Sequence, residues 1–510
     1  MLAKVHSGAV YGIDAYPVEI EVNEGRGDPQ TVIVGLPDAA VKESKDRVHT
    51  AILNSEFEMP DGRITINLAP ADIKKEGPIF DLPIAIGILA AQGLLPPDAL
   101  SQFGMVGELA LSGSVRSARG VLPITMAIKK DGRKMIIVPR DNAEEAAVVE
   151  GIKVFPVRNL REAADLIGGV KRPEPFLLDV KNIFESTSSY DEDFADVKGQ
   201  EQAKRAVEVA VAGGHNILMI GPPGTGKTML AKRIPSILPL MTLDEALEAT
   251  KIHSIAGALA PRQALVTHRP FRAPHHTVSD AGLLGGGAHP MPGEVSLAHH
   301  GVLFLDEFPE FHRNVLEVLR QPLENGAVTI SRAAASLTFP CQFMLVSAMN
   351  PCPCGYHGDR KRECRCTPLQ IRNYRNKISG PLLDRIDIHI EVPAVGYHEL
   401  SGLKAGEPSA DIRRRVIAAR NIQMQRFRGR KVHCNAAMRP KDTVKFCPLK
   451  DDAQAILKMA INELNFSARA YDRILKVART IADLAGKEQI ESEHVSEAIQ
   501  YRTLDRQFWI

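Results

Sequence analysis

The sequence predicts an α/β protein with more than one domain, and three features lead to this prediction. At 510 residues, the chain is long enough for two or three hydrophobic cores. Short apolar runs with strand spacing alternate with longer runs of helical spacing in residues 1–170 and again in 194–395. Residues 396–510 have helical spacing throughout. We therefore expect an α+β N-terminal domain, a linker over residues 171–193, an α/β core and a helical C-terminal domain.

The composition narrows the class of protein. Hydrophobic residues make up 44% and charged residues 24% of the chain, which is ordinary for a soluble protein. The net charge of only +2 gives no global basic field, so any nucleic-acid site must be local. Residues 1–8 lack the apolar core of a secretion signal, and no apolar run approaches the length of a membrane span. We therefore expect a cytoplasmic protein without a membrane partner, whose seven cysteines are thiols or metal ligands.

The N-terminal domain is expected to mix strands with helices. Alternating or short apolar runs predict strands, and a spacing near 3.6 residues predicts helices. The expected strands are 18–22, 31–35, 64–68 and 135–139, and the expected helices are 41–53 and 82–94. A proline-containing stretch at 171–175 and a polar, acidic stretch at 185–193 indicate a solvated linker after this domain.

Three stretches of this domain resemble the proteolytic domain of Lon proteases: Lys75–Pro78, 107–115 and 120–122. The resemblance implies a Lon-like fold. Where Lon-type enzymes carry a nucleophilic serine, however, this chain has residues 79–80, Ile-Phe, and Leu122 stands at the position of their lysine. A serine–lysine dyad needs a hydroxyl and a base within hydrogen-bond reach. We therefore expect a Lon-like domain without the dyad and without peptidase activity.

A glycine-rich loop in the core has the pattern of a phosphate-binding loop. It follows an apolar strand, 216–220, and precedes a helix that starts near Met229. Backbone N–H groups and the helix N-terminus favour a bound phosphate, so we expect ATP here. Lys227 is expected to contact the phosphates, and Thr228 to hold Mg²⁺. The residues of the expected nucleotide site are Gly221, Pro222, Pro223, Gly224, Thr225, Gly226, Lys227 and Thr228.

A second apolar strand in the core, 301–305, ends in two carboxylates. We expect Asp306 to join the Mg²⁺ shell and Glu307 to polarise the attacking water as a general base. An ordinary solvated strand end is the alternative interpretation. The complete phosphate-binding loop upstream favours the catalytic one.

Several stretches around these strands resemble the magnesium-chelatase-related AAA+ ATPases. Val197–Gln200, followed by a helix at 203–212, resembles the adenine-contacting segment of AAA+ proteins. The other matching stretches are 269–277, 282–287, 292–300, 308–311 and 319–324. The pattern is similar to that of the ComM/YifB branch over essentially the whole chain. The resemblance implies a ring of identical subunits, expected to be a hexamer.

The resemblance also implies roles for two residues downstream. Asn350, at the end of an expected strand over 343–349, matches the sensor-1 position, where an amide orients the lytic water. Arg385 matches an arginine finger, which reaches the γ-phosphate bound by a neighbouring subunit and can contribute ~10³–10⁵ in rate. An ion pair with Asp384 or Asp387 is the alternative for Arg385.

Four cysteines lie within fifteen positions, as two Cys-x-Cys arms separated by nine residues. This pattern predicts a structural Zn²⁺ site, although the arms are tighter than the common Cys-x₂-Cys spacing. Reduced thiols and redox chemistry are the alternatives. The expected ligands are Cys352, Cys354, Cys364 and Cys366. Nearby basic residues are expected to offset the thiolates or to touch a phosphate backbone: Arg360, Lys361, Arg362 and Arg365.

Two histidine pairs and a glycine loop lie in the long insertion between the two core strands. Adjacent residues on a strand face opposite sides, so the pairs 275–276 and 299–300 are poor chelators. We expect them to pack or to hydrogen-bond near the nucleotide or the channel of the ring. The loop at 285–287 either contacts substrate, as the corresponding insert does in related motors, or is structural.

The C-terminal domain carries a run of arginines and lysine between residues 413 and 431. Such a run is typical of a solvated helix face, and a local nucleic-acid contact is the alternative. The helix expected from Ser467 to Leu484 resembles the sensor-2 helix of the AAA+ lid, with Arg469 at the phosphate-sensing position. A final helix is expected over 492–501.

Three classes of function are compatible with an ATP hydrolase of this kind. ComM-type proteins are understood as helicases that drive branch migration during integration of incoming DNA in natural transformation, so the resemblance implies branched or single-stranded DNA as partner. A chelatase subunit would support Mg²⁺ insertion into a porphyrin, but such subunits lack the Lon-like domain. A protease would need the missing serine and lysine. We therefore favour the DNA helicase, with a chelatase subunit or a protein remodeller as alternatives.

Overall fold

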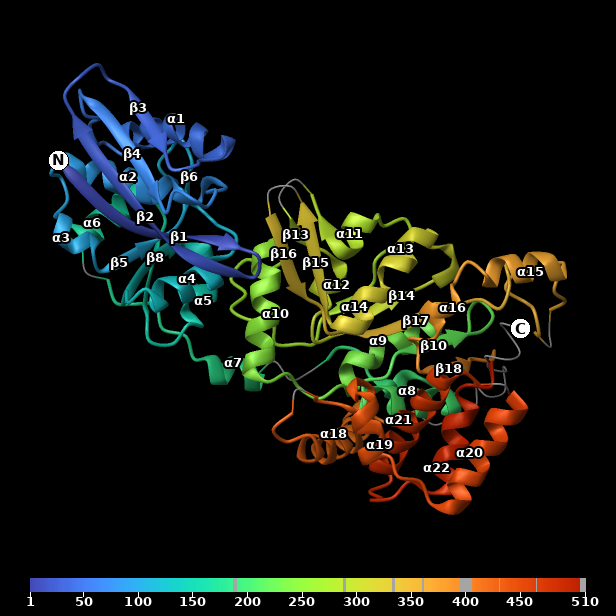
Figure 1. Ribbon diagram of the computed structural model, residues 1–510. Helices are drawn as coiled ribbons and strands as arrows, with labels where there is room; N and C mark the ends of the chain where they lie inside the picture. Colours follow the sequence, from blue (N-terminus) through green and yellow to red (C-terminus); the bar gives the residue numbers. More distant parts are fainter. Residues whose placement is uncertain are drawn as a thin grey trace. The chain divides into compact units, whose positions relative to one another are not determined.

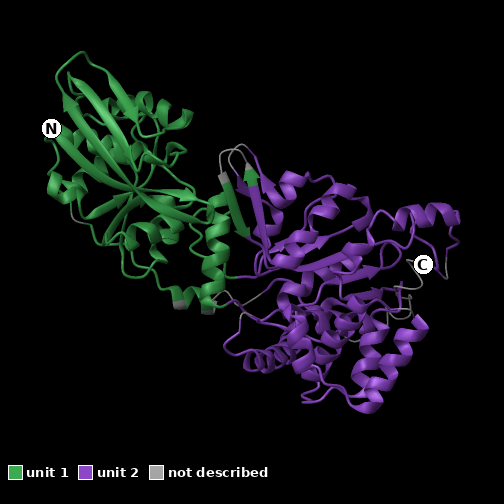
Figure 2. Cartoon of the chain, in the orientation of Figure 1, with its two compact units in different colours: residues 1–187, 242–267, 331–339 green, residues 188–241, 268–330, 340–510 purple. Residues whose placement is uncertain are grey.

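The computed structural model describes most of the chain, and it forms two compact units (Figures 1 and 2). The described residues are 1–171, 173–186, 190–287, 290–332, 335–359, 362–394, 406–430, 432–464 and 466–504. Unit 1 consists of residues 1–187, 242–267 and 331–339, and unit 2 of 188–241, 268–330 and 340–510. The four-part division expected from the sequence is a finer one, and its boundaries stay predictions.

Unit 1 is built on a seven-stranded mixed sheet with the strand order β3-β4-β2-β1-β5-β8-β9. The strands are β1 (Leu2–Tyr11), β2 (Asp14–Gly25), β3 (Thr31–Val34), β4 (Arg63–Ala69), β5 (Phe103–Met105), β8 (Met135–Pro139) and β9 (Lys153–Val157). β1 and β2 form a long antiparallel hairpin, whereas β1, β5, β8 and β9 run parallel to one another. The four strands expected from the sequence are confirmed as β2, β3, β4 and β8, and β1 was not expected.

The helices of unit 1 follow the hydrophobic pattern of the sequence. They are α1 (Ala39–Asn54), α2 (Asp81–Ala91), α3 (Pro97–Leu100), α4 (Val121–Lys130), α5 (Ala143–Ala147), α6 (Leu160–Ile167) and α7 (Val180–Ser186). Every residue of α2 is buried, as its apolar sequence after Asp81 requires, and the helix packs on β1 and β2. It ends before Gly93, whose φ of +80° is a conformation that glycine adopts readily. The expected helix over 82–94 is therefore three residues too long at its C-terminal end.

A segment that follows the phosphate-loop helix completes unit 1. Helix α10 (Leu243–Ala256) begins with a capping box between Thr242 and Glu245, and it packs against α4. Leu265, just after it, belongs to the same buried cluster as Leu122. The Ser254 hydroxyl donates a hydrogen bond of 2.5 Å to the buried carboxyl of Glu145. Unit 1 therefore needs residues 242–267 for its own core.

Unit 2 contains a five-stranded parallel sheet with the order β11-β14-β17-β10-β18. The strands are β10 (Ile217–Ile220), β11 (Phe271–Arg272), β14 (Val302–Leu305), β17 (Met344–Met349) and β18 (Ile388–Glu391). Since β17 lies between β14 and β10, the residues that follow these three strands meet at one edge of the sheet. In parallel α/β sheets, this edge is where ligands bind.

Helices surround this sheet and form the C-terminal part of unit 2. They are α8 (Glu201–Gly213), α9 (Lys227–Ile237), α11 (Asp280–Leu284), α12 (Glu294–Leu297), α13 (Arg313–Val318), α14 (Arg320–Asn325), α15 (Pro368–Arg375), α16 (Gly380–Leu383), α18 (Ser409–Arg426), α19 (Pro440–Phe446), α20 (Asp451–Leu464), α21 (Ala468–Leu484) and α22 (Ser492–Gln500). The Ser467 side chain accepts a hydrogen bond from the backbone N–H of Ala470, as expected for the N-cap of α21. The helical character expected for the C-terminal part is confirmed, while its role as an AAA+ lid stays a prediction.

Short strands pair at the periphery of the two sheets. They are β6 (Glu108–Leu109) with β7 (Val115–Arg116), β12 (Gly285–Gly286) with β13 (Met291–Pro292), and β15 (Ala327–Arg332) with β16 (Ala335–Pro340). Among the helices that are described, none combines the length and the apolar character needed to cross a lipid bilayer.

Candidate active site

The phosphate-binding loop lies between β10 and α9, as the sequence predicts. Helix α9 begins at Lys227, two residues earlier than expected, directly after Gly226 with its φ of +86°. Gly224 has a φ of +78°, and a Cβ atom placed on it would meet no other atom within 4 Å. The space in front of the loop is therefore open. With the N-terminus of an eleven-residue helix directed at it, this space suits an anionic phosphate.

The Lys227 side chain is folded back into the loop. Its Nζ atom donates hydrogen bonds to the carbonyls of Gly221 (2.6 Å) and Pro222 (2.8 Å) and lies 3.3 Å from Oδ1 of Asn350. Burial of the ammonium lowers the pKa of Lys227 to about 8, although the charge of Asp306 opposes this shift. A phosphate oxygen carries more negative charge than a carbonyl and is a stronger acceptor. The lysine is thus placed to transfer its hydrogen bonds to a phosphate.

Thr228 and the two carboxylates after β14 adjoin this lysine. The Thr228 hydroxyl donates a 2.7 Å hydrogen bond to Oδ2 of Asp306. Hydroxyl and carboxylate oxygens are ligands that Mg²⁺ accepts, usually together with water and substrate phosphates. Glu307 has a φ of +51°, which is strained for a residue other than glycine. Such strain is typical of functional sites.

Glu307 has an unexpected partner from the insertion. Nδ1 of His276 lies 3.2 Å from Oε2 of Glu307. The His276 ring lies tilted against His275 at 4.0 Å between centroids, and it forms an edge-to-face contact with Phe311 at 6.4 Å. The sequence predicts this histidine pair near the nucleotide or the channel, and His276 lies beside the residue expected to act as general base. The spacing of the sequence did not reveal this pairing, because 30 residues, including helices α11 and α12, separate the two positions.

Asn350 completes the group at the edge of the sheet. It follows β17, and its contact with Lys227 brings the expected sensor-1 amide into the phosphate loop. The structure therefore assembles Lys227, Thr228, Asp306 and Asn350 through direct contacts, with Glu307 adjacent to Asp306. The catalytic roles expected for these residues remain predictions, but their convergence is a property of the fold.

Arg385 and Arg469 contact neighbouring elements rather than this group. The guanidinium of Arg385, only 9% exposed, pairs with Glu324 and donates to the carbonyl of Pro381 at 2.5 Å. Arg469 lies 3.2 Å from Asp384. Asp387, the other carboxylate considered for Arg385, instead pairs with Arg473. The finger and sensor-2 roles stay predictions, and both arginines would have to change partners to fulfil them.

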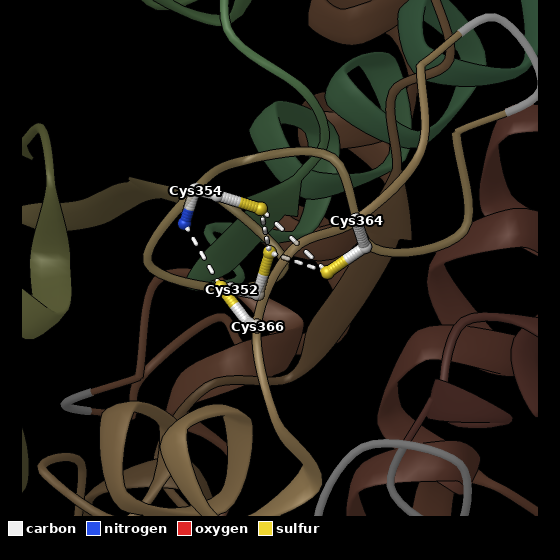
Figure 3. Close-up of side chains that lie close together, drawn as sticks. All are labelled: Cys352, Cys354, Cys364 and Cys366. Atoms are coloured by element: carbon white, nitrogen blue, oxygen red, sulfur yellow. Dashed lines mark hydrogen bonds between the residues drawn. The ribbon is translucent and has the colours of Figure 1, made fainter.

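The four cysteines expected to bind zinc form one cluster (Figure 3). Their sulfur atoms all lie within 4.8 Å of one another, with 3.3 Å between Cys352 and Cys354 and 3.6 to 3.7 Å from these to Cys364. Sulfur atoms around a tetrahedral Zn²⁺, with bonds of ~2.3 Å, would be ~3.8 Å apart. Backbone N–H groups of His357 and Cys354 donate to Cys352 and Cys366. The donor set and its spacing therefore fit a tetrahedral thiolate site.

The thiols of this cluster do not ionise alike. A hydrogen bond from the backbone of Tyr356 lowers the pKa of Cys354 to about 6. Burial and the neighbouring cysteines raise the pKa of Cys366 to about 12. A bound divalent cation would remove this difference between the thiols, because a metal deprotonates its thiol ligands. Of the basic residues expected to flank the cluster, Arg362 contacts the Tyr356 hydroxyl at 2.6 Å, while Arg360 and Lys361 lie outside the described residues.

The run of arginines along α18 is mostly engaged within unit 2. Arg415 pairs with Glu208 and Glu407, Arg426 with Asp483, and Arg430 with Asp442. Arg420 donates to the carbonyl of Val211 at 3.0 Å. The run is therefore more structural than either alternative assumed, since most of its charges hold α18 in place. Lys431, at its end, lies outside the described residues.

The positions that correspond to the Lon dyad are apolar and packed. Phe80 and Leu122 are fully buried, and Ile79 packs against the core of unit 1. The Leu122 backbone N–H donates to Glu145 at 2.8 Å. The side chains at these positions provide neither nucleophile nor base, as the sequence indicates.

Three family models match successive parts of the chain. Residues 193–400 match the family described as "Magnesium chelatase, subunit ChlI", and 406–502 match its C-terminal family. Residues 18–142 match "Subunit ChlI of Mg-chelatase". The parallel sheet, the phosphate loop and these matches define a Mg-chelatase-like AAA+ protein, a class whose membership indicates ATPase activity.

Relatives with similarity along the whole chain give a narrower family. "Competence protein ComM" of Haemophilus influenzae is 46% identical over 514 residues, covering 99% of this chain and 98% of that protein. "Uncharacterized protein YifB" of Escherichia coli is 44% identical over 510 residues, with 99% and 98% covered. "Lon protease 2" of Bacillus subtilis is 30% identical over 196 residues, 34% of this chain and 35% of that protein. The chain belongs to the ComM/YifB family, and its likeness to Lon is partial.

Proposed function

We propose that this protein is a ring-forming AAA+ ATPase that drives branch migration of DNA during the integration of incoming DNA in natural transformation. The observation that carries the proposal is the assembled group of Lys227, Thr228, Asp306 and Asn350, in a chain related over its full length to a competence protein. The group of residues supports ATP as the substrate that is hydrolysed. The relationship to a competence protein supports DNA as the molecule on which the ATPase acts.

Each residue of the group has a separate task in this proposal. When bound, Mg²⁺ supplies positive charge that neutralises the phosphates. Lys227 contacts the phosphate oxygens, while Thr228 and Asp306 hold the metal. Glu307 takes a proton from the attacking water, and the Asn350 amide orients that water. Arg385 of one subunit acts on the nucleotide of its neighbour, which makes ring assembly a condition for turnover.

Unit 2 also contains a connection between the nucleotide core and the C-terminal helices. Asp387, just before β18, contacts Arg473 of α21 and His215, whose Nε2 atom lies 2.8 Å from the Thr480 hydroxyl. All of these groups except Arg473 are essentially buried. A fully partnered buried network is rigid, so a shift of the sheet edge would be passed to α21. We propose that this network transmits the movement caused by phosphate release to the C-terminal helices, and that their movement shifts the bound DNA.

The cofactors of this protein are proposed to be Mg²⁺ with ATP, and a structural Zn²⁺ on Cys352, Cys354, Cys364 and Cys366. The spacing of the sulfur atoms supports the zinc assignment. The partners are proposed to be branched or single-stranded DNA and further copies of this chain in a hexamer. Contacts with DNA are expected mainly at phosphates, and therefore to weaken with salt.

Dissociation of a labelled four-way DNA junction tests the proposal. We expect the wild-type chain to dissociate the junction only with Mg²⁺ and ATP, and more efficiently than it acts on linear duplex. Lys227→Ala should be inactive, because it removes the contact with the phosphates. Lys232→Ala, on an exposed position of the same helix α9, is the matched control and should remain active.

Two other results would point elsewhere. ATP hydrolysis that DNA neither stimulates nor requires, with no junction dissociation, would contradict the DNA motor and favour a chelatase subunit or a protein remodeller. Porphyrin metallation with Mg²⁺, measured by absorbance, would separate those two. Undiminished hydrolysis in Lys227→Ala would contradict the assignment of the ATP site itself.

A further inference from the structure

We propose that the four-cysteine site positions Asn350 for ATP hydrolysis, so that occupancy by Zn²⁺ sets the turnover rate of the ATPase. This inference rests on the proposed function of the phosphate-loop site and on the proposed zinc ligands. It adds a link between them that neither the sequence pattern nor the family matches describe.

Only one residue of the chain separates Asn350 of the nucleotide site from the first cysteine of the cluster. Strand β17 ends at Met349, Asn350 follows it, and Cys352 is only two residues further along the chain. Cys352 is fully buried among the other sulfur atoms. A metal bound there fixes the backbone on the C-terminal side of Asn350, while the parallel sheet fixes it on the N-terminal side.

The cysteine loop also packs directly on the nucleotide loop. Gly355 has a φ of +86°, and a Cβ atom placed on it would lie 2.8 Å from Cδ of Pro223 and 3.9 Å from Cγ of Asn350. A side chain at position 355 therefore does not fit without displacing Pro223 of the phosphate loop. Close approach of backbone to a functional loop is a common reason for glycine at such a position. The cysteine loop is thus packed in direct contact with Pro223, beside Asn350.

The second pair of cysteines is tied back to the same place by helix α15. Cys366 precedes Thr367, which caps α15 through a capping box with Gln370. At the other end of the helix, the buried Arg375 donates from Nε and Nη2 to the carbonyl of Pro351, at 3.1 Å each. Both arms of the cluster are therefore anchored beside Asn350.

These contacts restrain the position of the Asn350 amide from several sides. Asn350 is held by the sheet, by Lys227 and by a loop whose shape depends on four sulfur atoms staying together. Without a cation, the four cysteines are free thiols, and no bond between their sulfur atoms closes the loop. Loss of the metal should then disorder the segment after Asn350, which leaves phosphate contacts intact but misplaces the water-orienting group. Small misplacements of this kind cost much of the rate of a reaction.

The decisive experiment removes zinc from the purified full chain and follows nucleotide binding and hydrolysis separately. We expect about one zinc per chain by atomic emission. A zinc-selective chelator, with Mg²⁺ in excess, should lower kcat about tenfold or more. Affinity for a fluorescent ATP analogue should change by less than about twofold, and added Zn²⁺ should restore kcat. Cys434→Ser removes a thiol outside the cluster and should behave as wild type throughout.

A second variant tests the link without changing a cysteine. Arg375→Gln should retain zinc and ATP binding while kcat falls, because the anchor on Pro351 is lost. Arg375→Lys, which keeps one donor, should recover part of the rate. Arg372→Gln on the exposed side of the same helix should have no effect. If Arg375→Gln does not fold, the zinc titration of the wild-type chain still decides the question.

The outcomes separate this inference from the proposals on which it rests. Zinc removal with unchanged kcat would overturn the link while leaving the ATPase and the metal site in place. Absence of any bound metal in the purified chain would overturn the zinc site and the link together. Loss of ATP binding along with the metal would show that the cluster maintains the whole nucleotide pocket, and it would overturn a specific effect on Asn350.

Discussion

Two lysines, one in each unit, are buried in the same way but have different surroundings. Lys75 is 0% exposed and donates from Nζ to the carbonyl of Ile73 at 2.7 Å. Lys227 is 8% exposed and donates to two carbonyls of its own loop. Burial lowers the pKa of both ammonium groups. Only Lys227 adjoins an amide, a hydroxyl and carboxylates at the end of parallel strands.

The comparison shows that burial of a charged group is not by itself a sign of catalysis. Unit 1 also buries Asp81 with Arg47, and Glu145 among hydrogen-bond donors, yet these groups hold helices and loops in place. What distinguishes the site in unit 2 is that several polar groups converge on an open space. Three residues with proposed functions in unit 2, an arginine, a glutamate and a lysine, have structural counterparts of the same type in unit 1, and these pairs provide matched tests.

The largest difference is expected for the pair of arginines. Arg385→Ala should lower ATP turnover by ~10³-fold or more, the order for an arginine finger. Arg47→Ala should leave turnover within about twofold but reduce the stability of unit 1 by about 3 kcal/mol, since it breaks a buried ion pair. Steady-state hydrolysis and thermal melting measure the two effects.

Mixing experiments then test whether the finger acts between subunits. Arg385→Ala and Lys227→Ala chains, each inactive alone, should hydrolyse ATP when combined, because some interfaces unite an intact finger with an intact loop. Absence of rescue at every ratio would show that Arg385 acts within its own subunit or not at all.

The carboxylates should differ by ~10²–10⁴-fold in turnover, the range for a general base. Glu307→Gln is expected to bind ATP normally and to hydrolyse it slowly, because the amide cannot accept a proton. Glu145→Gln should cost about 1–3 kcal/mol of stability, as one of its buried partners is left unsatisfied, with little effect on turnover. Equal turnover of Glu307→Gln and wild type would remove Glu307 from the proposed mechanism.

Substitution of the two lysines should give variants whose rates of ATP hydrolysis differ by ~10²-fold. Lys227→Ala is expected to lose activity because it removes the ammonium that contacts the phosphates, whereas Lys75→Met should retain activity. A Lys75→Met chain that melts like wild type but does not hydrolyse ATP would contradict the view that Lys75 has only a structural role.

The smallest effect concerns the pH dependence of ATP binding. With its pKa at about 8, Lys227 of the nucleotide-free protein is charged below pH 8 and neutral above it. A bound phosphate favours the charged form, so binding above pH 8 requires uptake of a proton. The Kd for a fluorescent ATP analogue should therefore be flat below pH 8 and rise about tenfold per pH unit above it. Lys227→Arg, which stays charged, should not show this rise.

The elements of the site were predictable from local pattern, but several contacts were not. The strand, loop and helix around Lys227, and the strand ends at Asp306 and Asn350, are encoded in short stretches of sequence. The pairing of His276 with Glu307 and of Arg385 with Glu324 depends on tertiary packing between distant stretches. Spacing predicted four metal ligands, but it did not predict that α15 would return to Pro351.

The fold shows the same division between local and distant information. Strand β1 was missed because its pattern is interrupted by small and polar residues, while ten paired positions with β2 stabilise it in the sheet. The helical periodicity of 243–256 does not reveal which unit the helix joins. Periodicity specifies an apolar face, and only the rest of the fold specifies what covers it.

The discontinuity of unit 1 has a consequence for the order in which the protein is made. Residues 1–187 leave the ribosome before α10 and Leu265, which lie up to about 80 residues further along. At ~5–20 residues per second, the N-terminal sheet waits roughly 4–16 s for the segment that closes its second core. By then the phosphate loop has also been synthesised. The nascent unit 1 therefore lacks part of its core until the phosphate loop has been synthesised. A chain truncated near residue 187 would lack that part of the core permanently.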